Sequence, residues 1–207
     1  MKLLACGRFF TENRENGTME KLDYENYEML VAEAGRFHGD ICPGISIGTR
    51  MTMIGLRRIG ITDPKGDDRK KIMVFVEIDR CIADAVMALT GCRPGKRTMK
   101  VKDYGKMAAT FINLETGKAV RLAAAMRKGE RGLEDIATAP DEELFSIAEV
   151  EVPLLPDDMP GKPTRRVTCS SCGEAIMDGR DIEAGGGFVC KPCQAEKNYY
   201  RVLAPVN

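Results

Sequence analysis

Cysteine is the residue type of this chain best suited to chemistry, because eight cysteines occur among 207 residues. Four of them form two Cys-x-x-Cys pairs that are separated by 17 residues. The first pair is Cys169 and Cys172, and the second is Cys190 and Cys193. A two-residue gap lets both thiolates of a pair bind one tetrahedral ion, and two pairs complete its coordination. Four thiolates leave no position for water or substrate, so the spacing predicts a structural zinc ion.

Redox-active dithiols or disulfides are the alternative interpretation of these cysteines. Disulfide-dense domains are usually short and secreted. The N-terminal segment MKLLACGRFF has too short an apolar run for a secretory signal. A module of roughly forty residues also has too small a core to fold without a metal or another crosslink. Zinc is therefore the expected cofactor of the C-terminal segment.

A second group of candidate ligands lies upstream. The single histidine, His38, precedes Cys42 by four positions across a turn that contains Gly39, so both side chains can reach one metal ion. Cys81 falls at the start of a predicted helix, where the helix dipole and the free N–H groups favour the thiolate. We predict that His38, Cys42 and Cys81 form a metal or thiol site, with zinc as the expected second metal. The alternative is a buried structural histidine among ordinary core thiols.

Acidic residues lie near these candidate ligands in the sequence. Asp40, Glu77 and Asp84 are the neighbours expected to orient a ligand or to transfer protons. If the site is catalytic, its candidate residues are Cys81, Cys42, Asp40 and Asp84.

The two remaining cysteines are not expected to bind this metal. Cys6 lies in a polar N-terminal leader and has no predicted role. If residues 80–90 are helical, Cys81 and Cys92 lie about 15 Å apart at 1.5 Å per residue. Two ligands of one zinc ion need sulfurs much closer than that, because Zn–S bonds are about 2.3 Å long. Cys92 is therefore expected to face a second subunit or to be a core thiol.

The elements that position these residues are visible in the sequence pattern. Apolar residues recur at helical spacing over 22–38, and a second helix is predicted from Pro43 to about Ile59. Small residues form a stripe on this second helix, which indicates close packing or, less simply, the approach of a ligand. The stripe consists of Gly44, Gly48, Thr52 and Gly55.

The rest of the upstream region mixes strands with helices. A β-branched run over 71–78 predicts a strand, and Asp79 is expected to cap the helix over 80–90. Further strands are predicted over 99–101, 106–114 and 118–124, the last two joined by a hairpin turn at 115–117, and a last helix over 141–150. This irregular order favours an α+β fold over a doubly wound sheet.

Composition changes divide the chain into four parts. Residues 1–20 are expected to form the loose leader, 21–150 the α+β core domain, 151–165 a linker with four prolines, and 166–207 the zinc module. No apolar run approaches the ~20 residues that span a bilayer, so we expect no membrane segment and a cytoplasmic protein.

Charge argues against nucleic acid as a partner. The formal net charge is zero, and five Lys or Arg residues balance five Asp or Glu residues over 166–201. A nucleic-acid-binding ribbon would show a basic excess.

Several motifs resemble one known family. The segment Phe37-His38-Gly39-Asp40-Ile41-Cys42-Pro43-Gly44 is similar to the HGHxCPG motif of the FmdE subunit of formylmethanofuran dehydrogenase. Cys81-Ile82-Ala83-Asp84-Ala85, Gly91-Cys92 and Asp103-Tyr104-Gly105-Lys106 resemble later segments of that family in the same order. The resemblance covers about residues 22–125, and a C-terminal zinc module occurs in some members.

The resemblance implies an α+β core, a Cys/His metal site in a cleft and a homodimer. It also implies a link to the molybdenum- or tungsten-dependent dehydrogenase that handles a one-carbon unit, whose pterin-bound metal other subunits hold. This chain departs from the family pattern in three places: Asp40 replaces the second His, Met87 stands where Gln is common, and Arg93-Pro94 follows Gly-Cys. A carboxylate in place of an imidazole changes the metal preference of a site.

Three functional hypotheses follow. The leading one is an FmdE-like metal-binding protein, associated with redox chemistry as an oxidoreductase or as an accessory subunit with dehydrogenase partners. The alternative is a non-catalytic zinc-ribbon adaptor that mediates assembly, with one structural zinc and buried upstream cysteines. A DNA-binding regulator is disfavoured by the charge balance.

Overall fold

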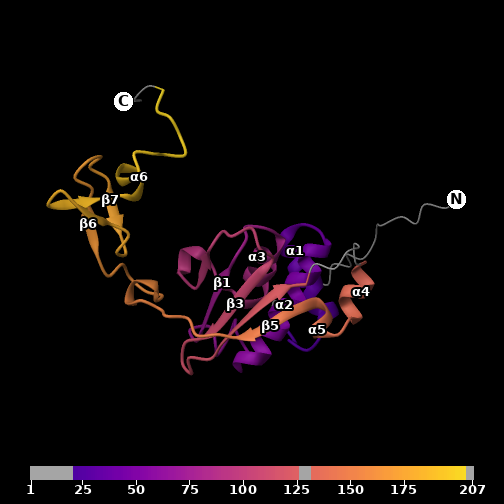
Figure 1. Cartoon of the computed structure of the whole chain (residues 1–207). Coiled ribbons are helices and arrows are strands. Elements are labelled where there is room, and N and C mark those ends of the chain that lie inside the picture. The colour runs from indigo at the N-terminus through magenta and orange to yellow at the C-terminus, as the bar shows by residue number, and fades with distance from the viewer. Residues whose placement is uncertain (1–20, 126–131, 204–207) are drawn as a thin grey trace, which may run out of the picture.

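A five-stranded sheet, with two helices packed on one face and a third helix packed against those two, forms the larger part of the protein (Figure 1). The computed structural model describes residues 21–125 and 132–203, so the predicted leader and its Cys6 lie outside the described residues. The elements of this part are α1 (Tyr27–His38), α2 (Pro43–Ile59), β1 (Ile72–Val76), α3 (Cys81–Thr90), η1 (Pro94–Lys96), β2 (Met99–Val101), β3 (Ala108–Asn113), β4 (Ala119–Ala124), α4 (Leu133–Thr138), α5 (Asp141–Leu144) and β5 (Phe145–Glu149).

The sheet has the order β2-β1-β3-β4-β5. Strands β1 and β2 are parallel, and every other neighbouring pair is antiparallel. The predicted turn at 115–117 joins β3 to β4 as a hairpin. This mixed sheet with helices confirms the predicted α+β class.

The core lies between the sheet and the helices. Val74 pairs with Phe111, and Phe111 pairs with Val120 on the next strand. Directly paired residues point to the same face of a sheet, so these three side chains form one row. All three are at most 1% exposed, and they pack with apolar residues of α2 and α3.

The small residues of α2 allow unusually close packing. A Cβ atom at Gly48 would lie 2.7 Å from the Cβ of Ala85 on α3, and one at Gly55 would collide with the ring of Phe111. Non-bonded carbon atoms need about 3.5–4.0 Å. The stripe therefore brings α2 onto both α3 and the sheet, which confirms the packing interpretation at these two positions.

Some predicted helix boundaries were wrong. Helix α1 begins at Tyr27 rather than near residue 22, because the Asn26 side chain caps it by accepting a hydrogen bond from the backbone N–H of Met29. Asp79 does not cap α3: Arg80 holds that position without a side-chain hydrogen bond, and Cys81 is the first helical residue.

The predicted helix over 141–150 was also wrong beyond its first turn. Helix α5 ends at Leu144, and the chain continues as β5, which pairs with β4. Phe145 and Ile147 alternate with exposed Ser146 and Ala148. This alternation extends the buried face of the sheet, and the hydrogen bonds available at the edge of β4 outweigh the local helical preference. Helix α4 was not predicted.

Glu77 lies at the end of β1 on the sheet face opposite the helices. Its carboxylate accepts two hydrogen bonds from Arg121, at 2.6 Å from Nε and 2.7 Å from Nη2. The carboxylate of Glu77 is thus bonded to Arg121, and Glu77 is neither in the cluster of candidate metal ligands nor among the residues that line the hollow beside it. The bond from Arg121 is also the main reason that the pKa of Glu77 is lowered.

We expect this pair to make the stability of the core depend on pH. Because the folded pKa lies below the ordinary value of 4.5, the contribution is complete above that value and is lost as pH falls through the folded pKa. At neutral pH, Glu77→Gln should lower the free energy of unfolding by about 1–3 kcal/mol. Urea unfolding of both proteins should show this difference shrinking towards about pH 3. A difference that stays constant with pH would contradict the assignment.

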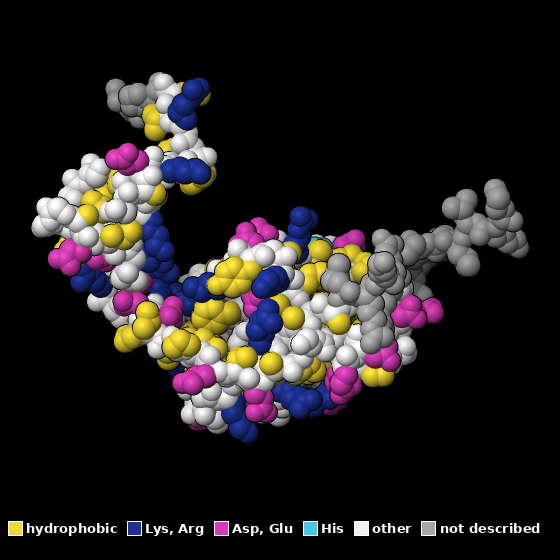
Figure 2. All heavy atoms as spheres, in the orientation of Figure 1, with side chains coloured by type: hydrophobic (Ala, Val, Ile, Leu, Met, Phe, Trp, Pro, Cys, Tyr) yellow, Lys and Arg dark blue, Asp and Glu magenta, His cyan; other side chains and the backbone are white. Residues whose placement is uncertain are grey.

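The C-terminal part is a separate small module. The elements that follow β5 are η2 (Pro156–Asp158), β6 (Arg166–Thr168), β7 (Ala175–Met177), β8 (Ile182–Ala184), β9 (Gly187–Val189) and α6 (Lys191–Gln194). Strands β6 and β7 form one hairpin, and β8 and β9 form a second. Figure 1 shows that the segment after β5 leads to this module, and Figure 2 shows it projecting from the larger part in the same orientation. The guanidinium of Arg97 links the two parts, because it contacts the backbone carbonyls of Asp157 and Met159 and the carboxylate of Asp178.

Among the described residues, no helix has the length and apolar character that a bilayer span requires.

Candidate metal centres

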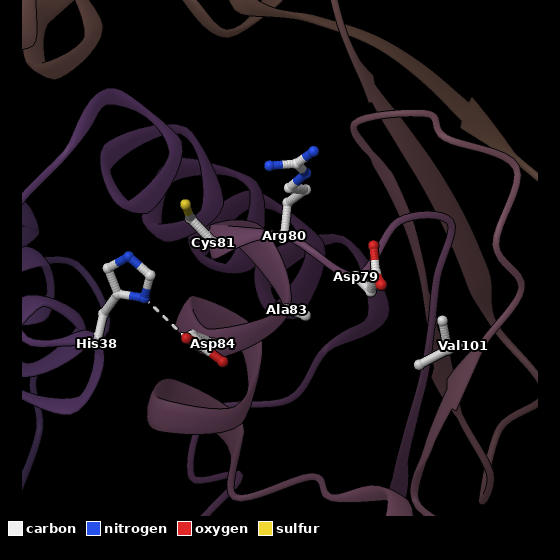
Figure 3. A pocket seen from close by; sticks show the side chains of 7 residues that line it. All are labelled: His38, Asp79, Arg80, Cys81, Ala83, Asp84 and Val101. Carbon is white, nitrogen blue, oxygen red and sulfur yellow. Dashed lines mark hydrogen bonds and ion pairs between the residues drawn. The ribbon is translucent and has the colours of Figure 1, made fainter.

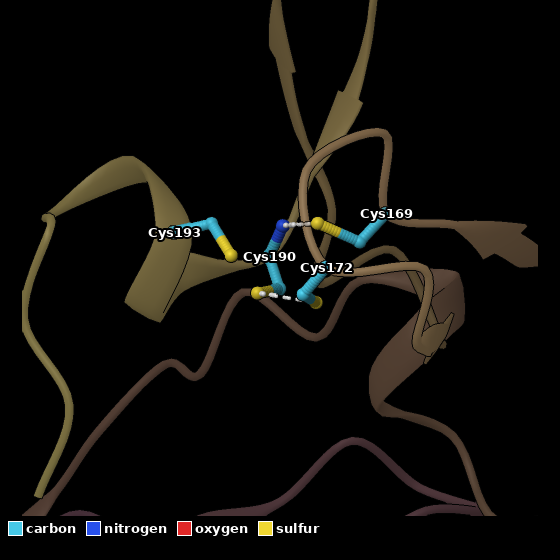
Figure 4. Close-up of side chains that lie close together, drawn as sticks. All are labelled: Cys169, Cys172, Cys190 and Cys193. Atoms are coloured by element: carbon cyan, nitrogen blue, oxygen red, sulfur yellow. Dashed lines mark hydrogen bonds between the residues drawn. The ribbon is translucent and has the colours of Figure 1, made fainter. Parts of the chain in front are cut away.

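The four downstream cysteines converge in the C-terminal module (Figure 4). Cys169 and Cys172 follow β6, whereas Cys190 and Cys193 lie at the end of β9 and in α6. Their sulfur atoms all lie within 4.8 Å of one another, and those of Cys172 and Cys190 are 3.9 Å apart. Tetrahedral coordination with Zn–S bonds of ~2.3 Å requires sulfur atoms about 3.8 Å apart. The donor set therefore fits a closed four-thiolate zinc site.

Backbone N–H groups favour the thiolate form of Cys169. The N–H of Cys190 donates to Sγ of Cys169 at 3.4 Å. Hydrogen bonds from the backbone at Cys172 and Cys190 are the largest causes that lower the pKa of Cys169 to about 6. A thiol that is ready to lose its proton near neutral pH is suited to binding zinc, because the ligand is the thiolate.

A second group of ligands forms where three helices of the core meet. His38 is the last residue of α1, Cys42 is the N-cap of α2, and Cys81 is the first residue of α3. Their ligand atoms all lie within 4.8 Å of one another, and all three residues are half-buried. The structure therefore brings together the three residues that the sequence singled out.

Local backbone geometry explains the convergence. Gly39 ends α1 with φ of 112°, in the left-handed region that favours glycine, and the chain then turns towards α2. The Sγ atom of Cys42 accepts a hydrogen bond from the N–H of Ile45 at 3.4 Å, which fixes this thiol at the start of α2. Gly44 makes room for α3, since a Cβ atom there would lie 2.9 Å from the Cβ of Cys81.

Asp84 orients the imidazole of His38 (Figure 3). Its Oδ2 atom lies 2.7 Å from Nδ1, which leaves Nε2 as the nitrogen available to a metal ion. Metal-binding histidines commonly donate their other N–H to a carboxylate in this way. Asp40 lies on the other side of the ring, 3.6 Å from Nε2, and its side chain is 74% exposed. It therefore stands at the rim of the site rather than among the three ligands.

The two core thiols are not easily ionised together. Burial is the largest cause that raises the pKa of Cys81, and the neighbouring Cys42 thiol raises it further. Two adjacent thiolates repel each other unless a cation lies between them. A divalent ion supplies that charge, so this pair is suited to a metal.

An open hollow adjoins the core cluster. It has a volume of about 380 Å³ and is lined by His38, Cys81 and Asp84 together with Asp79, Arg80, Ala83 and Val101. Figure 3 shows these side chains around the hollow, with Cys81 on its wall. Three protein ligands beside an open space are the arrangement of a metal site that keeps a position for substrate or water.

The remaining predicted residue, Cys92, lies in the core. Its side chain is 2% exposed, and its sulfur lies 3.9 Å from the carbonyl oxygen of Ile72. Of the two roles considered for it, the structure therefore supports the core thiol.

Two residues beside the core cluster were not predicted from the sequence to belong to a site. Gly44 was assigned a packing role, and Arg80 was not identified as a residue that lines the hollow. The place of Gly44 beside the thiols could have been predicted, because it follows Cys42-Pro43 directly in the sequence.

Residues 37–146 match the sequence profile of the family described as "FmdE, Molybdenum formylmethanofuran dehydrogenase operon". This match covers more than half of the chain. The chain belongs to the FmdE family. Residues 163–199 match a second family, described as "Prokaryotic dksA/traR C4-type zinc finger". This match and the four converging thiols agree with the predicted zinc module.

A solved structure supports the FmdE assignment. The chain is similar to an FmdE-like protein of the tungsten formylmethanofuran dehydrogenase type from Syntrophus aciditrophicus, with 25% identity and a TM-score of 0.55. The similarity covers 84% of this chain and 95% of that one.

A curated relative shares only part of its length. It is named "Probable S-adenosyl-L-methionine-binding protein" and comes from Archaeoglobus fulgidus. It is 34% identical over 94 residues, which are 45% of this chain and 26% of the relative. The chain thus spans about a quarter of the length of that relative.

Proposed function

We propose that this FmdE-family protein binds a metal ion at His38, Cys42 and Cys81 and presents it to a small molecule in the adjoining hollow. Zinc is the ion that one imidazole and two thiolates favour. The second zinc, bound by the four cysteines of the C-terminal module, is structural. The convergence of three ligand atoms within 4.8 Å beside an open space is the observation that supports the proposal.

The residues around the core ion would have distinct roles. Asp84 holds Nδ1 of the His38 ring and so leaves Nε2 available to the ion, and it strengthens the imidazole as a ligand. When bound, the ion supplies Lewis-acid polarisation to a group placed in the hollow. Arg80 and Asp79 at the lining offer opposite charges to such a group. Asp40 at the rim is placed to exchange protons with solvent.

The family assignment suggests the biological setting. We propose a redox-associated role in one-carbon metabolism, as an accessory subunit of a formylmethanofuran dehydrogenase or as a relative that acts alone. A cytoplasmic homodimer, with dehydrogenase subunits as further partners, fits that role. The competing function is a non-catalytic adaptor, in which the core thiols bind no metal and the zinc module mediates assembly.

Cobalt substitution tests whether the core ion has an open position. Cobalt replaces zinc in such sites and gives visible bands that depend on its ligands. Azide is expected to change the spectrum of the fully loaded protein, because the four-thiolate site is closed and only the core ion can accept a fourth ligand. The change should disappear in Cys81→Ser. Two bound cobalt ions with no response to azide would show a closed structural site and would refute the proposed function.

A further inference from the structure

Two of the core ligands can also react with each other. We infer that Cys42 and Cys81 form a dithiol that exchanges with small disulfide compounds and closes into a Cys42–Cys81 disulfide when no ion is bound. This inference concerns the same residues as the proposed function but does not require the metal.

The two sulfurs flank a single position on α2. A Cβ atom built on Gly44 would lie 3.2 Å from Sγ of Cys81 and 3.6 Å from Sγ of Cys42. Both sulfurs belong to a cluster whose ligand atoms lie within 4.8 Å of one another. Because Gly44 has no side chain, the space between the two thiols is free, and their sulfur atoms can approach each other when no ion lies between them.

The helices that carry the thiols hold them in place. Cys42 caps α2 and Cys81 begins α3, and these helices touch closely where Gly48 meets Ala85. Closing a disulfide here joins two groups that are already fixed near each other, so it costs little chain entropy. Among the described residues, Cys92 belongs to no such cluster, and it is 2% exposed within the apolar core.

The hollow sets the order of the reaction. Cys81 lines it, whereas Cys42 is not among the lining residues. The Cys81 thiolate attacks one sulfur of the disulfide compound, forms a mixed disulfide and releases the first thiolate. The Cys42 thiolate then attacks the Cys81 sulfur and releases the second. The protein loses two electrons, the compound is reduced to two thiols, and the two cysteine protons pass to the released thiolates.

Charges around the hollow select the class of disulfide. The carboxylates of Asp79 and Asp84 line it, and Asp40 lies 3.6 Å from the His38 ring. The guanidinium of Arg80 is the one Lys or Arg group among the lining residues. The excess of negative charge favours a cationic disulfide over an anionic one. Metal binding and disulfide formation exclude each other, since both use the same sulfur lone pairs.

Cystamine, a small cationic disulfide, is the probe for the test. The full-length protein is first dialysed against a chelator that removes bound ions and is then treated with cystamine. Remaining thiols are alkylated, and tryptic peptides are analysed by mass spectrometry. Trypsin leaves Cys81 and Cys92 on one peptide, so the Cys92→Ser protein is analysed in parallel. We expect a peptide linked through Cys42 and Cys81 in both proteins. We also expect cystamine to react about tenfold faster than the anionic 3,3′-dithiodipropionate.

Single variants separate the two steps. Cys42→Ser should stop at a stable mixed disulfide on Cys81, and Cys81→Ser should form neither product in the core. Recovery of Cys42 and Cys81 as alkylated thiols in the wild-type protein would overturn the inference, as would faster reaction with the anionic compound.

The metal content measured before chelation reports on the proposed function alone. A linked peptide from a protein that held no core ion before chelation would support the dithiol and refute the metal site. A core ion before chelation, with no linked peptide after the ion is removed, would support the metal site and overturn the dithiol.

Discussion

Replacing Cys190 with serine is expected to unfold the C-terminal module while the five-stranded core stays folded. The module has almost no apolar interior: between residues 166 and 203, Cys169 and Ile176 are the buried hydrophobic side chains among those described. Such a small core cannot offset the conformational entropy lost when the module folds. Structural zinc supplies about 10–16 kcal/mol of apparent binding free energy in comparable small modules. Loss of one thiolate removes most of that stabilisation.

Limited trypsin digestion followed by mass spectrometry measures this effect. In the Cys190→Ser protein, rapid cleavage is expected at basic residues of the module such as Arg180 and Lys197, with a stable core fragment left behind. The zinc content should fall by one ion per chain. Cys92→Ser is the matched control, since it removes a thiol that lies in the core away from both clusters. A module that resists trypsin without its zinc would contradict the structural role.

Adding one methyl group at Gly44 is expected to weaken the core metal site without weakening the fold. The new Cβ would lie 2.9 Å from the Cβ of Cys81 and 3.2 Å from its sulfur, so α3 or the thiol has to move. Metal–ligand distances in well-formed sites stay within about 0.2 Å of their standard values. We therefore expect metal affinity at this site to fall by about 10–100-fold, the range known for disturbed support of metal ligands.

Competition with a chromophoric chelator measures the affinity, and thermal unfolding measures the fold. Gly44 lies within α2, where alanine is intrinsically favoured over glycine by about 1 kcal/mol. The variant should therefore unfold at nearly the same temperature as the wild type. Gly95→Ala is the control, because a Cβ atom there meets nothing within 4 Å. Unchanged affinity in Gly44→Ala would show that the thiols do not use this space.

Local patterns were sufficient to predict several features of this protein. The spacing of four cysteines identified the ligands of the C-terminal module, because two short Cys-x-x-Cys segments carry their own geometry. Helix α2 was bounded correctly by Pro43 and by the glycine after Ile59. The three candidate ligands of the core were singled out because each was predicted to lie near a helix end.

Long-range pairing explains what the sequence did not reveal. Residues 145–149 were predicted to be helical, and they form β5 because β4 offers them an edge to pair with. The bond between His38 and Asp84 spans 46 positions, and the pair of Glu77 and Arg121 spans 44. A carboxylate near a candidate ligand in sequence could therefore face either the site or the opposite side of the sheet. The hollow could not be predicted from local patterns either, because the residues that line it come from separate elements of the chain.

Metal content per chain tests the central claim that the core binds an ion of its own. The full-length protein is expected to bind two zinc ions, one in the module and one at His38, Cys42 and Cys81. Cys81→Ser should bind one, and the module should keep its resistance to trypsin. One ion in the wild-type protein, or an unchanged count in Cys81→Ser, would show that the core cluster is not a metal centre.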